Sequence, residues 1–592
     1  NFYASALDLL RWEQSLYESK LVSAETLAEA FQPVRLNDGT TYPYGFGWFL
    51  DPEAGIVSHT GGWVGFTNII VRDLKNKATL IVLTNGSDGS AIRLVPAWYQ
   101  GKSLPAIPLT HLIQNVRLID GAGNPVRTVD VRLKGDRIWE TGALEPFPGE
   151  AVTEGRGKVL TPGFIDTHSH HFGNMEQHRD MKAAVSQGIT SIVIGQDGYG
   201  DLVDTIQKRL NDAAVAVNVA PYTGHTSLRL RVMGPTGWFR PASRAEIDSM
   251  DRLLAQDPAR GSWGLSTGLE YERAFLSNRA EVLRLAHTTA KAGGRYMSHI
   301  RSEDIHLMEA LDEILQIGRE THMPVQISHF KIALREHWGK APQLLAQLQK
   351  ARAEGIDITA DCYPYDYWHS TIRVLFPKRD YDNPASAVFA CENLFDPEGS
   401  VMLRFAPEPA YAGKTVADIA RLRQEAPAQT LLYLVAAAEA FENAHPDADG
   451  VEAIMGKSMS PQDVGTLLAW PHTNICSDGG HGGHPRGSGA FTRVLKKYVR
   501  EEQWFTLVEA IRKMTGLAAE HLGWTDRGLI APGYYADLVL LDPETVGDRA
   551  SIDDSTALSD GILMVWVNGV PVYRSGATTG TYPGRLLLRK GL

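Results

Sequence analysis

The stretch VLTPGFIDTHSHH, residues 159–171, runs from an apolar strand into a cluster of histidines. The same order, an apolar strand that ends in polar residues and leads into a helical stretch, recurs seven more times. The further units are ITSIVIGQDG (189–198), VAVNVAPYTGH (215–225), SWGLSTGLEY (262–271), GRYMSHIRSED (294–304), PVQISHFK (324–331), IDITADCYPYD (356–366) and TNICSDGGHGG (473–483). These repeats predict an α/β protein built on a (β/α)8 TIM barrel, whose strand ends converge on one face.

Histidines and an aspartate stand at the predicted strand ends. His168 and His170 are two positions apart, so both side chains point to the same face of an extended segment. His299 and His329 end the fifth and sixth strands, and Asp478 ends the eighth. Imidazole and carboxylate ligands suit zinc and its neighbours in the first transition row. The set predicts a metal-dependent barrel with one or two zinc ions, or another divalent metal.

Short alternating runs separated by turn signals flank the barrel on both sides, such as VRLIDGAGNP before it and YADLVLLDP after it. They predict one small β-sandwich that residues 111–159 and 528–592 form together. The barrel then spans residues 160–527. The connection after its seventh strand, about 374–471, is much longer than an ordinary loop and predicts an inserted lid or cap.

The first 103 residues have a different pattern. ALDLLRWEQSLYESKLVSAETLAEAF, residues 6–31, predicts a pair of amphipathic helices, and three strand-like runs follow it. The two prolines of SLPAIPL indicate a linker over residues 104–110. The pattern predicts a separate α+β segment over residues 1–103.

This segment resembles the closing part of the serine β-lactamase and penicillin-binding-protein family, because His59, Thr60 and Gly61 are similar to its third motif, usually Lys-Thr-Gly. The nucleophile of that family lies in a Ser-x-x-Lys turn, which the first hundred residues do not contain. A Ser-x-x-Lys match at Ser328 to Lys331 falls in the sixth barrel strand. We therefore expect no β-lactam chemistry from this partial β-lactamase-like segment.

Composition narrows the class of protein. The 592 residues predict at least two folded units. The formal charge of −11, with scattered lysines and arginines, argues against nucleic acid as a partner. No apolar run reaches the length of a membrane span, and three cysteines exclude a disulfide framework. We expect a soluble protein. The chain begins at Asn1 with no visible signal peptide, and this start fits a truncated end, so a cytoplasmic and a periplasmic location both stay open. The oligomeric state also stays open.

The barrel motifs resemble the amidohydrolase superfamily, and more narrowly the D-aminoacylase, or N-acyl-D-amino-acid deacylase, family. The resemblance covers residues 111–592 and rests on GFIDTHSH, GLSTGLEY, MSHIRSE, QISHFK, DCYPY, SDG, HPRGSG and DRGLIAPGYYADLVLLDPETV. It implies hydrolysis of a linear amide bond, from N-acyl-D-amino acid to D-amino acid and carboxylate. A metal-activated water would attack the amide, with Asp478 as general base and then general acid.

The resemblance also implies a ligand set. The family has a cysteine in an Asn-Cys-Gly turn after the second strand, where this chain has Gln196, Asp197 and Gly198. Asp197 is the candidate ligand, although a carboxylate is harder than a thiolate and should bind zinc less tightly. A plain Asp-Gly turn stays open, and Glu270 is the alternative bridging ligand. One subsite would comprise His168, His170 and Asp478, and the other Asp197, His299 and His329.

On the substrate side, the resemblance implies that Tyr271, Lys331, Tyr363 and Arg486 hold the carboxylate of an N-acyl amino acid or D-amino-acid-containing peptide. His225 either orients the carbonyl or is structural. A hydantoinase-like cyclic amidohydrolase, a D-peptidase and a serine β-lactamase-like module with a non-catalytic barrel stay open as alternatives. The first would more usually have a bridging carboxylated lysine, and no lysine ends the fourth strand.

Overall fold

The computed structural model describes residue 4 and residues 6–63, 66–84, 95, 110–147, 150–235, 237–448 and 450–589. The chain divides into two compact units. Unit 1 comprises residues 1–108 and 147–149, and unit 2 comprises residues 109–146 and 150–592. The predicted linker at 104–110 lies, except for Thr110, outside the described residues.

The described part of unit 1 contains an antiparallel sheet and two helices. Its four-stranded sheet has the order β3 (Phe49–Asp51), β4 (Ile56–Trp63), β5 (Phe66–Asp73), β6 (Ala78–Thr84), and the remaining elements are α1 (Ala6–Tyr17), α2 (Ala24–Ala30), β1 (Val34–Arg35) and β2 (Thr41–Tyr42). Arg72 of β5 donates to Glu13 of α1 at 2.6 Å, and both side chains are buried. This buried ion pair joins the helix to the sheet.

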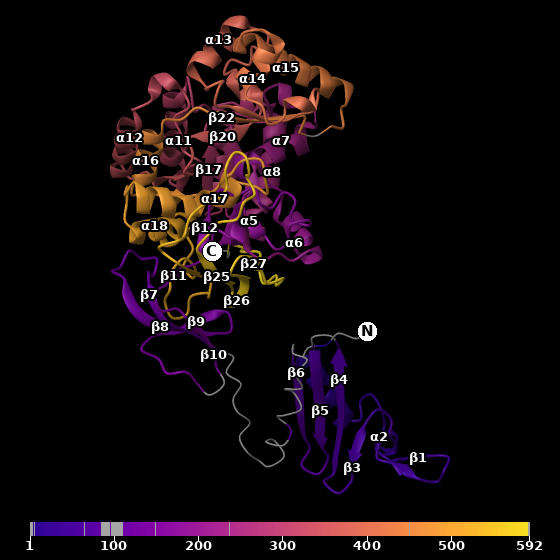
Figure 1. Ribbon diagram of the computed structural model, residues 1–592. Helices are drawn as coiled ribbons and strands as arrows, with labels where there is room; N and C mark the ends of the chain where they lie inside the picture. Colours follow the sequence, from indigo (N-terminus) through magenta and orange to yellow (C-terminus); the bar gives the residue numbers. More distant parts are fainter. Residues whose placement is uncertain are drawn as a thin grey trace. The chain divides into compact units, whose positions relative to one another are not determined.

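A nine-stranded sheet joins the two ends of unit 2 (Figure 1). Along the sheet the strands are β27 (Ala577–Thr578), β26 (Val570–Arg574), β25 (Ile562–Val567), β24 (Leu538–Leu541), β11 (Val159–Pro162), β7 (Thr110–Leu118), β8 (Arg127–Lys134) and β9 (Arg137–Gly142), with β10 (Ala151–Glu154) paired to β7. Val159 of β11 pairs with Leu541 of β24. Next to this pair, Lys158 contacts Asp542 at 2.7 Å across 384 positions of sequence.

The rest of unit 2 is built around parallel strands. One sheet contains β12 (Phe164–Asp166), β13 (Ile189–Ile194) and β14 (Asn218–Pro221), and the other contains β15 (Thr223–Gly224), β16 (Gly264–Gly268), β17 (Arg295–His299), β18 (Val325–Ile327), β19 (Ile358–Cys362) and β23 (Thr473–Ile475). All of β13, ITSIVI, is buried, as expected for a parallel strand covered on both faces.

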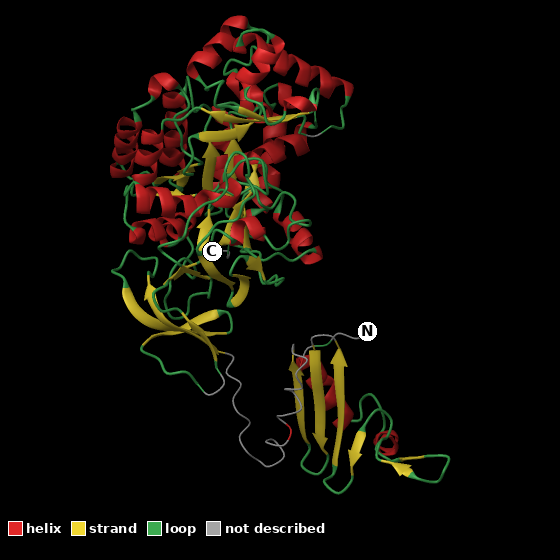
Figure 2. Cartoon of the chain, in the orientation of Figure 1, coloured by secondary structure: helices red, strands yellow, loops and turns green. Residues whose placement is uncertain are grey.

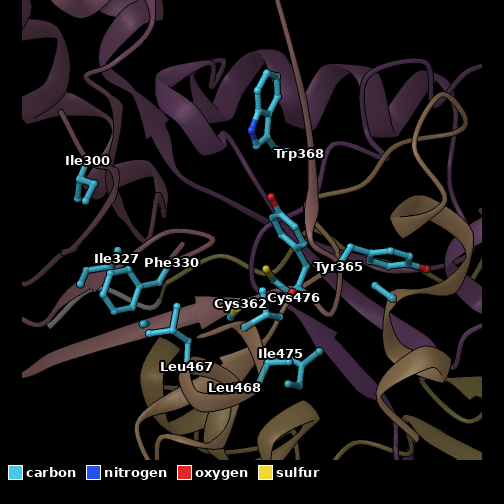
Figure 3. Close-up of a cluster of buried hydrophobic side chains, with 14 of the residues drawn as sticks. Ile300, Ile327, Phe330, Cys362, Tyr365, Trp368, Leu467, Leu468, Ile475 and Cys476 are labelled. Atoms are coloured by element: carbon cyan, nitrogen blue, oxygen red, sulfur yellow. Dashed lines mark hydrogen bonds between the residues drawn. The ribbon is translucent and has the colours of Figure 1, made fainter. Parts of the chain in front are cut away.

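Helices alternate with these strands along the chain (Figure 2). They include α5 (Lys182–Val185), α6 (Val203–Asp212), α7 (His225–Met233), α8 (Arg244–Gln256), α9 (Glu272–Phe275), α10 (Arg279–Lys291), α11 (Leu307–Thr321), α12 (Ala341–Ala353), α16 (Pro461–Ala469), α17 (Arg486–Arg493), α18 (Leu507–Met514) and α19 (Gly516–Leu522). Figure 3 shows how Ile327 of β18, Cys362 of β19 and Ile475 of β23 gather with Leu467 and Leu468 of α16 in the buried core. No helix among the described residues is both long and apolar enough to cross a membrane.

An additional layer of elements separates β19 from α16. It contains β20 (Tyr367–Ser370), η5 (Ile372–Leu375), α13 (Pro384–Asn393), β21 (Val401–Phe405), η6 (Pro409–Tyr411), α14 (Val416–Arg423), α15 (Pro427–Ala444) and β22 (Glu452–Lys457), with β22 antiparallel between β20 and β21. The buried carboxylate of Glu452 accepts the backbone N–H of Ile372 at 3.0 Å. Trp368 donates to Ser458 at 2.7 Å. These two contacts fix the segment that follows β19.

Candidate metal centre

The segments after the first and last parallel strands lie side by side. The N–H of Asp478 donates to the carbonyl of His168 at 2.8 Å, and the N–H of His170 donates to the carbonyl of Gly479 at 2.9 Å. These bonds bring the His-x-His pair beside the carboxylate of Asp478, although more than three hundred residues separate them in the sequence.

His168, His170, Asp197 and Asp478 form one group of candidate ligand atoms, all within 4.8 Å of one another. His168 Nε2 lies 3.4 Å from Asp478 Oδ1 and 3.5 Å from Asp197 Oδ2. His170 Nε2 lies 3.2 Å and 3.4 Å from the same two oxygens. Two imidazoles thus face two carboxylates around one point.

Asp197, His299 and His329 form a second group within the same distance limit. Asp197 Oδ1 is 3.2 Å from His329 Nε2 and 3.8 Å from His299 Nδ1, and these two nitrogens are 2.9 Å apart. Asp197 therefore presents Oδ2 to the first group and Oδ1 to the second. A side chain in this position can connect two metal ions.

Three of these side chains stand on left-handed backbone. The φ angles are 57° for Asp197, 36° for His329 and 48° for Asp478. Such conformations cost about 1 to 3 kcal/mol each for a residue with a side chain and persist where the surroundings impose them. At His329 the N–H donates to Asp361 Oδ1 at 2.6 Å, which holds the turn.

Glu270 lies behind His299 and not between the two groups. Its Oε2 is 2.9 Å from His299 Nε2, whereas Asp197 and His329 face the Nδ1 of that ring. Burial and the nearby Glu303 raise the pKa of Glu270 to about 8. The geometry suits a group that orients His299 through its second nitrogen. With His299 and Glu303, Glu270 also forms a third group of candidate ligand atoms, and its alternative role as bridging ligand stays a prediction.

Glu303, which the sequence pattern did not single out, lies at the centre of the contacts around His329 and Lys331. Lys331 Nζ donates to both oxygens of Glu303, at 2.6 and 2.7 Å, and Glu303 Oε1 lies 3.1 Å from His329 Nδ1. All three side chains are buried. The one clue in the sequence that could have identified Glu303 is its position four residues after His299, in the RSED segment that follows the fifth predicted strand.

Of the four residues predicted to hold substrate, Lys331, Arg486 and Tyr271 line the same cleft. Arg486 Nη1 lies 2.6 Å from Asp478 Oδ2, and the Tyr271 hydroxyl lies 3.5 Å from Asp197 Oδ2. The buried Tyr363 ring lies under the Arg486 guanidinium, with 4.7 Å between Cζ and the ring centroid. The structure therefore brings all four residues close to the candidate metal centre.

His225 has a different environment. Its Nε2 lies 2.9 Å from Glu281, which also accepts from Arg229 at 2.6 Å, and all three side chains are buried. This triad occupies the start of α7 and a neighbouring helix. The contacts favour the structural alternative for His225.

The cleft opens beside the second ligand group. Its lining joins the second ligand group to both substrate-side cations and to an apolar wall; the lining residues are Glu270, Tyr271, His299, Glu303, Asp304, His329, Lys331, Ala333, Trp368, His369, Ser370, Val374, Leu375, Leu394, Asp478 and Arg486. A small molecule in this cleft can reach the candidate metal centre and the cations at the same time.

The residues of the centre fit a divalent transition metal. Among the described residues, neither ring nitrogen of the fully buried His168 has a hydrogen-bond partner, which is unusual for a buried polar group. Burial and Lys331 lower the pKa of His329, but the carboxylates of Glu303 and Asp478 outweigh them and raise it to about 10. The cluster is thus rich in negative charge and attracts a cation. Imidazole and carboxylate groups are common zinc ligands in proteins.

Known proteins resemble the chain along nearly its whole length. Residues 369–573 match the model of the amidohydrolase family, and residues 1–101 match that of the beta-lactamase family. Three relatives from Alcaligenes xylosoxydans xylosoxydans are an N-acyl-D-aspartate deacylase at 34% identity (80% of this chain, 94% of the relative), a D-aminoacylase at 32% (81% and 98%) and an N-acyl-D-glutamate deacylase at 33% (81% and 97%).

Solved structures from the same family also resemble this chain. A crystal structure of D-aminoacylase has a TM-score of 0.72 at 32% identity and covers 81% of this chain and 99% of its own. N-acyl-D-glutamate deacylase from Bordetella bronchiseptica, complexed with zinc and a phosphonate inhibitor, has a TM-score of 0.71 at 30% identity with the same coverage. A binuclear metal centre is described for D-aminoacylase. The likeness therefore extends to a protein with zinc in its structure and to one with two metals in its centre.

Proposed function

The chain belongs to the N-acyl-D-amino-acid deacylase family of amidohydrolases, and we propose from this membership that it hydrolyses N-acyl-D-amino acids to D-amino acids and carboxylates. One observation carries the proposal. Asp197 is shared by two groups of candidate ligand residues, and His299, His329 and Asp478 of these groups line a cleft that also contains Lys331 and Arg486. The two cations can hold a substrate carboxylate while the amide lies at the metals.

We propose that the parallel strands of unit 2 form one (β/α)8 barrel over residues 160–527. Only Tyr222 separates β14 from β15, so these two are halves of the third strand. A parallel bridge between Ser169 and Gly479 links the segments after β12 and β23 and supports closure. The nine-stranded sheet would be the sandwich of residues 111–159 and 528–592, and residues about 374–471 the insertion.

The residues proposed to hold metal are His168, His170, Asp197 and Asp478 in one subsite, and Asp197, His299 and His329 in the other. When bound, zinc supplies a Lewis acid that lowers the pKa of water toward neutrality and polarises the amide carbonyl. The protein contributes the orientation: Glu270 holds the Nε2 side of His299, and Asp361 holds the His329 turn. A metal loaded into this site therefore meets ligands that are already aligned.

Asp478 is the proposed general base and acid. It would accept a proton from the attacking water and return it to the nitrogen of the leaving amine. Arg486 lies 2.6 Å from its other oxygen, and Lys331 is held by Glu303. A substrate carboxylate that enters the cleft would share these two cations with Asp478 and Glu303. Binding and proton transfer then use neighbouring groups of one site.

The test is release of free amino acid from matched N-acetyl-D- and N-acetyl-L-amino acids by the zinc-loaded full chain, with a chelator-treated sample as control. We expect release from the D series alone, and loss of that release in the chelated sample. Equal activity with and without chelator would contradict the proposal, and so would hydrolysis confined to the L series.

Arg486→Lys should raise KM for an N-acetyl-D-amino acid by roughly tenfold or more, because a lysine replaces the two parallel donors of the guanidinium with a point charge. Arg493→Lys is the matched control, since Arg493 is an arginine of the same helix, α17, that contacts Asp548 at 3.0 Å and lies outside the cleft lining. Steady-state kinetics would measure both. Equal KM values for the Arg486→Lys variant and the wild type would exclude Arg486 from carboxylate binding.

For unit 1 we propose no catalytic role. His59 of its HTG segment is exposed on β4, and its Nε2 lies 3.0 Å from the Tyr44 hydroxyl. The Ser-x-x-Lys motif that its family would need is absent from the first hundred residues. The hydrolase reaction is therefore assigned to unit 2.

A further inference from the structure

Two cations line the cleft, and each already has an acidic partner. Lys331 is bound to both oxygens of Glu303, and Arg486 is paired with Asp478. Under the proposed function, these two cations hold the carboxylate that every N-acyl amino acid carries. The other described lining residues include no lysine or arginine; they are histidines, carboxylic acids and uncharged side chains.

The remaining polar lining is acidic. Glu270, Glu303 and Asp304 face the cleft, and Asp304 is held by the Ser302 hydroxyl at 2.5 Å. His369 is the nearest additional base, but burial and then Arg486 lower its pKa to about 4, so it is uncharged at neutral pH. A second carboxylate on the substrate would meet carboxyl groups here, and no lysine or arginine beyond the two that already have acidic partners.

The opposite wall is apolar and comes mostly from the segment inserted after β19. Trp368, Val374, Leu375 and Leu394 line the cleft together with Ala333. Trp368, Leu375 and Leu394 are buried, whereas Val374 is half-buried. The Glu452 and Ser458 bonds described above hold this wall in place. It offers a preformed surface for an apolar group.

Cations do exist nearby, but they lie in a separate cavity on the other side of η5. That cavity contains Arg373, Lys378 and Arg379. Arg373 is paired with Glu442 at 2.7 Å. Arg379 donates to the carbonyls of Glu270 and Phe376 and stacks over Phe275, with 4.4 Å to the ring centroid. Arg373 and Arg379 are thus engaged, and none of the three cations lines the cleft.

We infer that this deacylase takes N-acyl-D-amino acids with an uncharged, apolar side chain and rejects those of D-aspartate and D-glutamate. The inference rests on the proposed function and narrows it. Sequence identity does not show which side chain the substrate carries. The N-acyl-D-aspartate deacylase is 34% identical to this chain, the N-acyl-D-glutamate deacylase 33% and the D-aminoacylase 32%. The lining of the cleft separates the possible side chains by charge.

The experiment compares N-acetyl-D-leucine with N-acetyl-D-aspartate and N-acetyl-D-glutamate on the zinc-loaded full chain. We expect kcat/KM for the leucine compound to be higher by roughly 100-fold or more, because a side-chain charge that the cleft cannot pair loses its hydration without compensation. Equal or faster hydrolysis of either acidic compound would overturn the inference.

A binding measurement keeps this inference distinct from the proposed function. Calorimetry with the same three compounds reads the preference of the cleft even if none of them is hydrolysed. Absence of turnover on the whole D series with zinc retained would contradict the deacylase function, whereas tighter binding of an acidic compound would contradict the inference about the side chain.

Two variants of one wall residue sharpen the test. Val374→Arg places a cation on the apolar wall and should raise kcat/KM for the acidic compounds by roughly tenfold while lowering it for N-acetyl-D-leucine. Val374→Met, of similar bulk but uncharged, should leave the order of preference unchanged. If both variants changed the preference equally, charge would not be the basis of the selection, and the inference would fail.

Discussion

Replacing Asp478 with asparagine is expected to lower kcat by about 10²- to 10⁴-fold, the usual contribution of a positioned general base and acid. Asparagine keeps the size of the side chain and one oxygen that faces His168 and His170, but it cannot accept a proton from water. Kinetics at saturating substrate would measure the loss. Because Asp478 is also a candidate ligand, the zinc content of the same sample must be determined.

Asp304→Asn is the matched control for this variant. Asp304 lines the same cleft and is buried, but its carboxylate belongs to none of the candidate ligand groups. It should keep kcat within a few-fold of the wild type. An Asp478→Asn protein that holds its full zinc content and turns over at a rate within tenfold of the wild type would exclude the proton-transfer role.

Asp197→Ala should weaken zinc binding more than the roughly 10- to 100-fold that is typical when a group behind a ligand is removed. The reason is its position: one carboxylate supplies an oxygen to each of the two ligand groups, so both subsites lose a donor. Asp197→Cys should restore binding, with higher affinity than the wild type, since a thiolate is the softer ligand. Titration against a chromogenic chelator would give each Kd.

Glu270→Gln is the comparison that decides between Asp197 and Glu270. The glutamine can still contact His299 Nε2, and the structure puts residue 270 on the far side of that ring. We expect a smaller loss of zinc affinity than in Asp197→Ala. The reverse order would make Glu270 the bridging ligand and leave Asp197 as a structural turn residue.

Strand-end chemistry was the part of the site accessible from sequence. His168, His170, His299, His329 and Asp478 each follow a run of apolar residues, and the structure brings their side chains together because parallel strands end at a common edge. Their role as ligands stays a prediction. Asp197 was harder, because an Asp-Gly pair is also an ordinary turn, and only the three-dimensional structure shows its two oxygens facing two groups.

Other features of the site were not indicated by the sequence around them. Glu303 lies among charged residues in RSED, a pattern typical of an exposed loop, and only the fold pairs it with Lys331. The apolar wall was also inaccessible, because it comes from a long insertion whose sequence does not tell which residues turn toward the strands. For His225 the sequence left a substrate role and a structural role open, and its contact with Glu281, which Arg229 also binds, favours the structural one.

The nine-stranded sheet has a consequence for synthesis on the ribosome. Its central pairing joins β11 to β24, and the Lys158–Asp542 contact beside it spans 384 positions. At about 5 to 20 residues per second, the nascent chain must wait tens of seconds between making one half of this sheet and the other. Until then β11 has an unpaired edge, a place where chains aggregate. Such high contact order predicts slow folding of unit 2 and a need for chaperones that cover this edge.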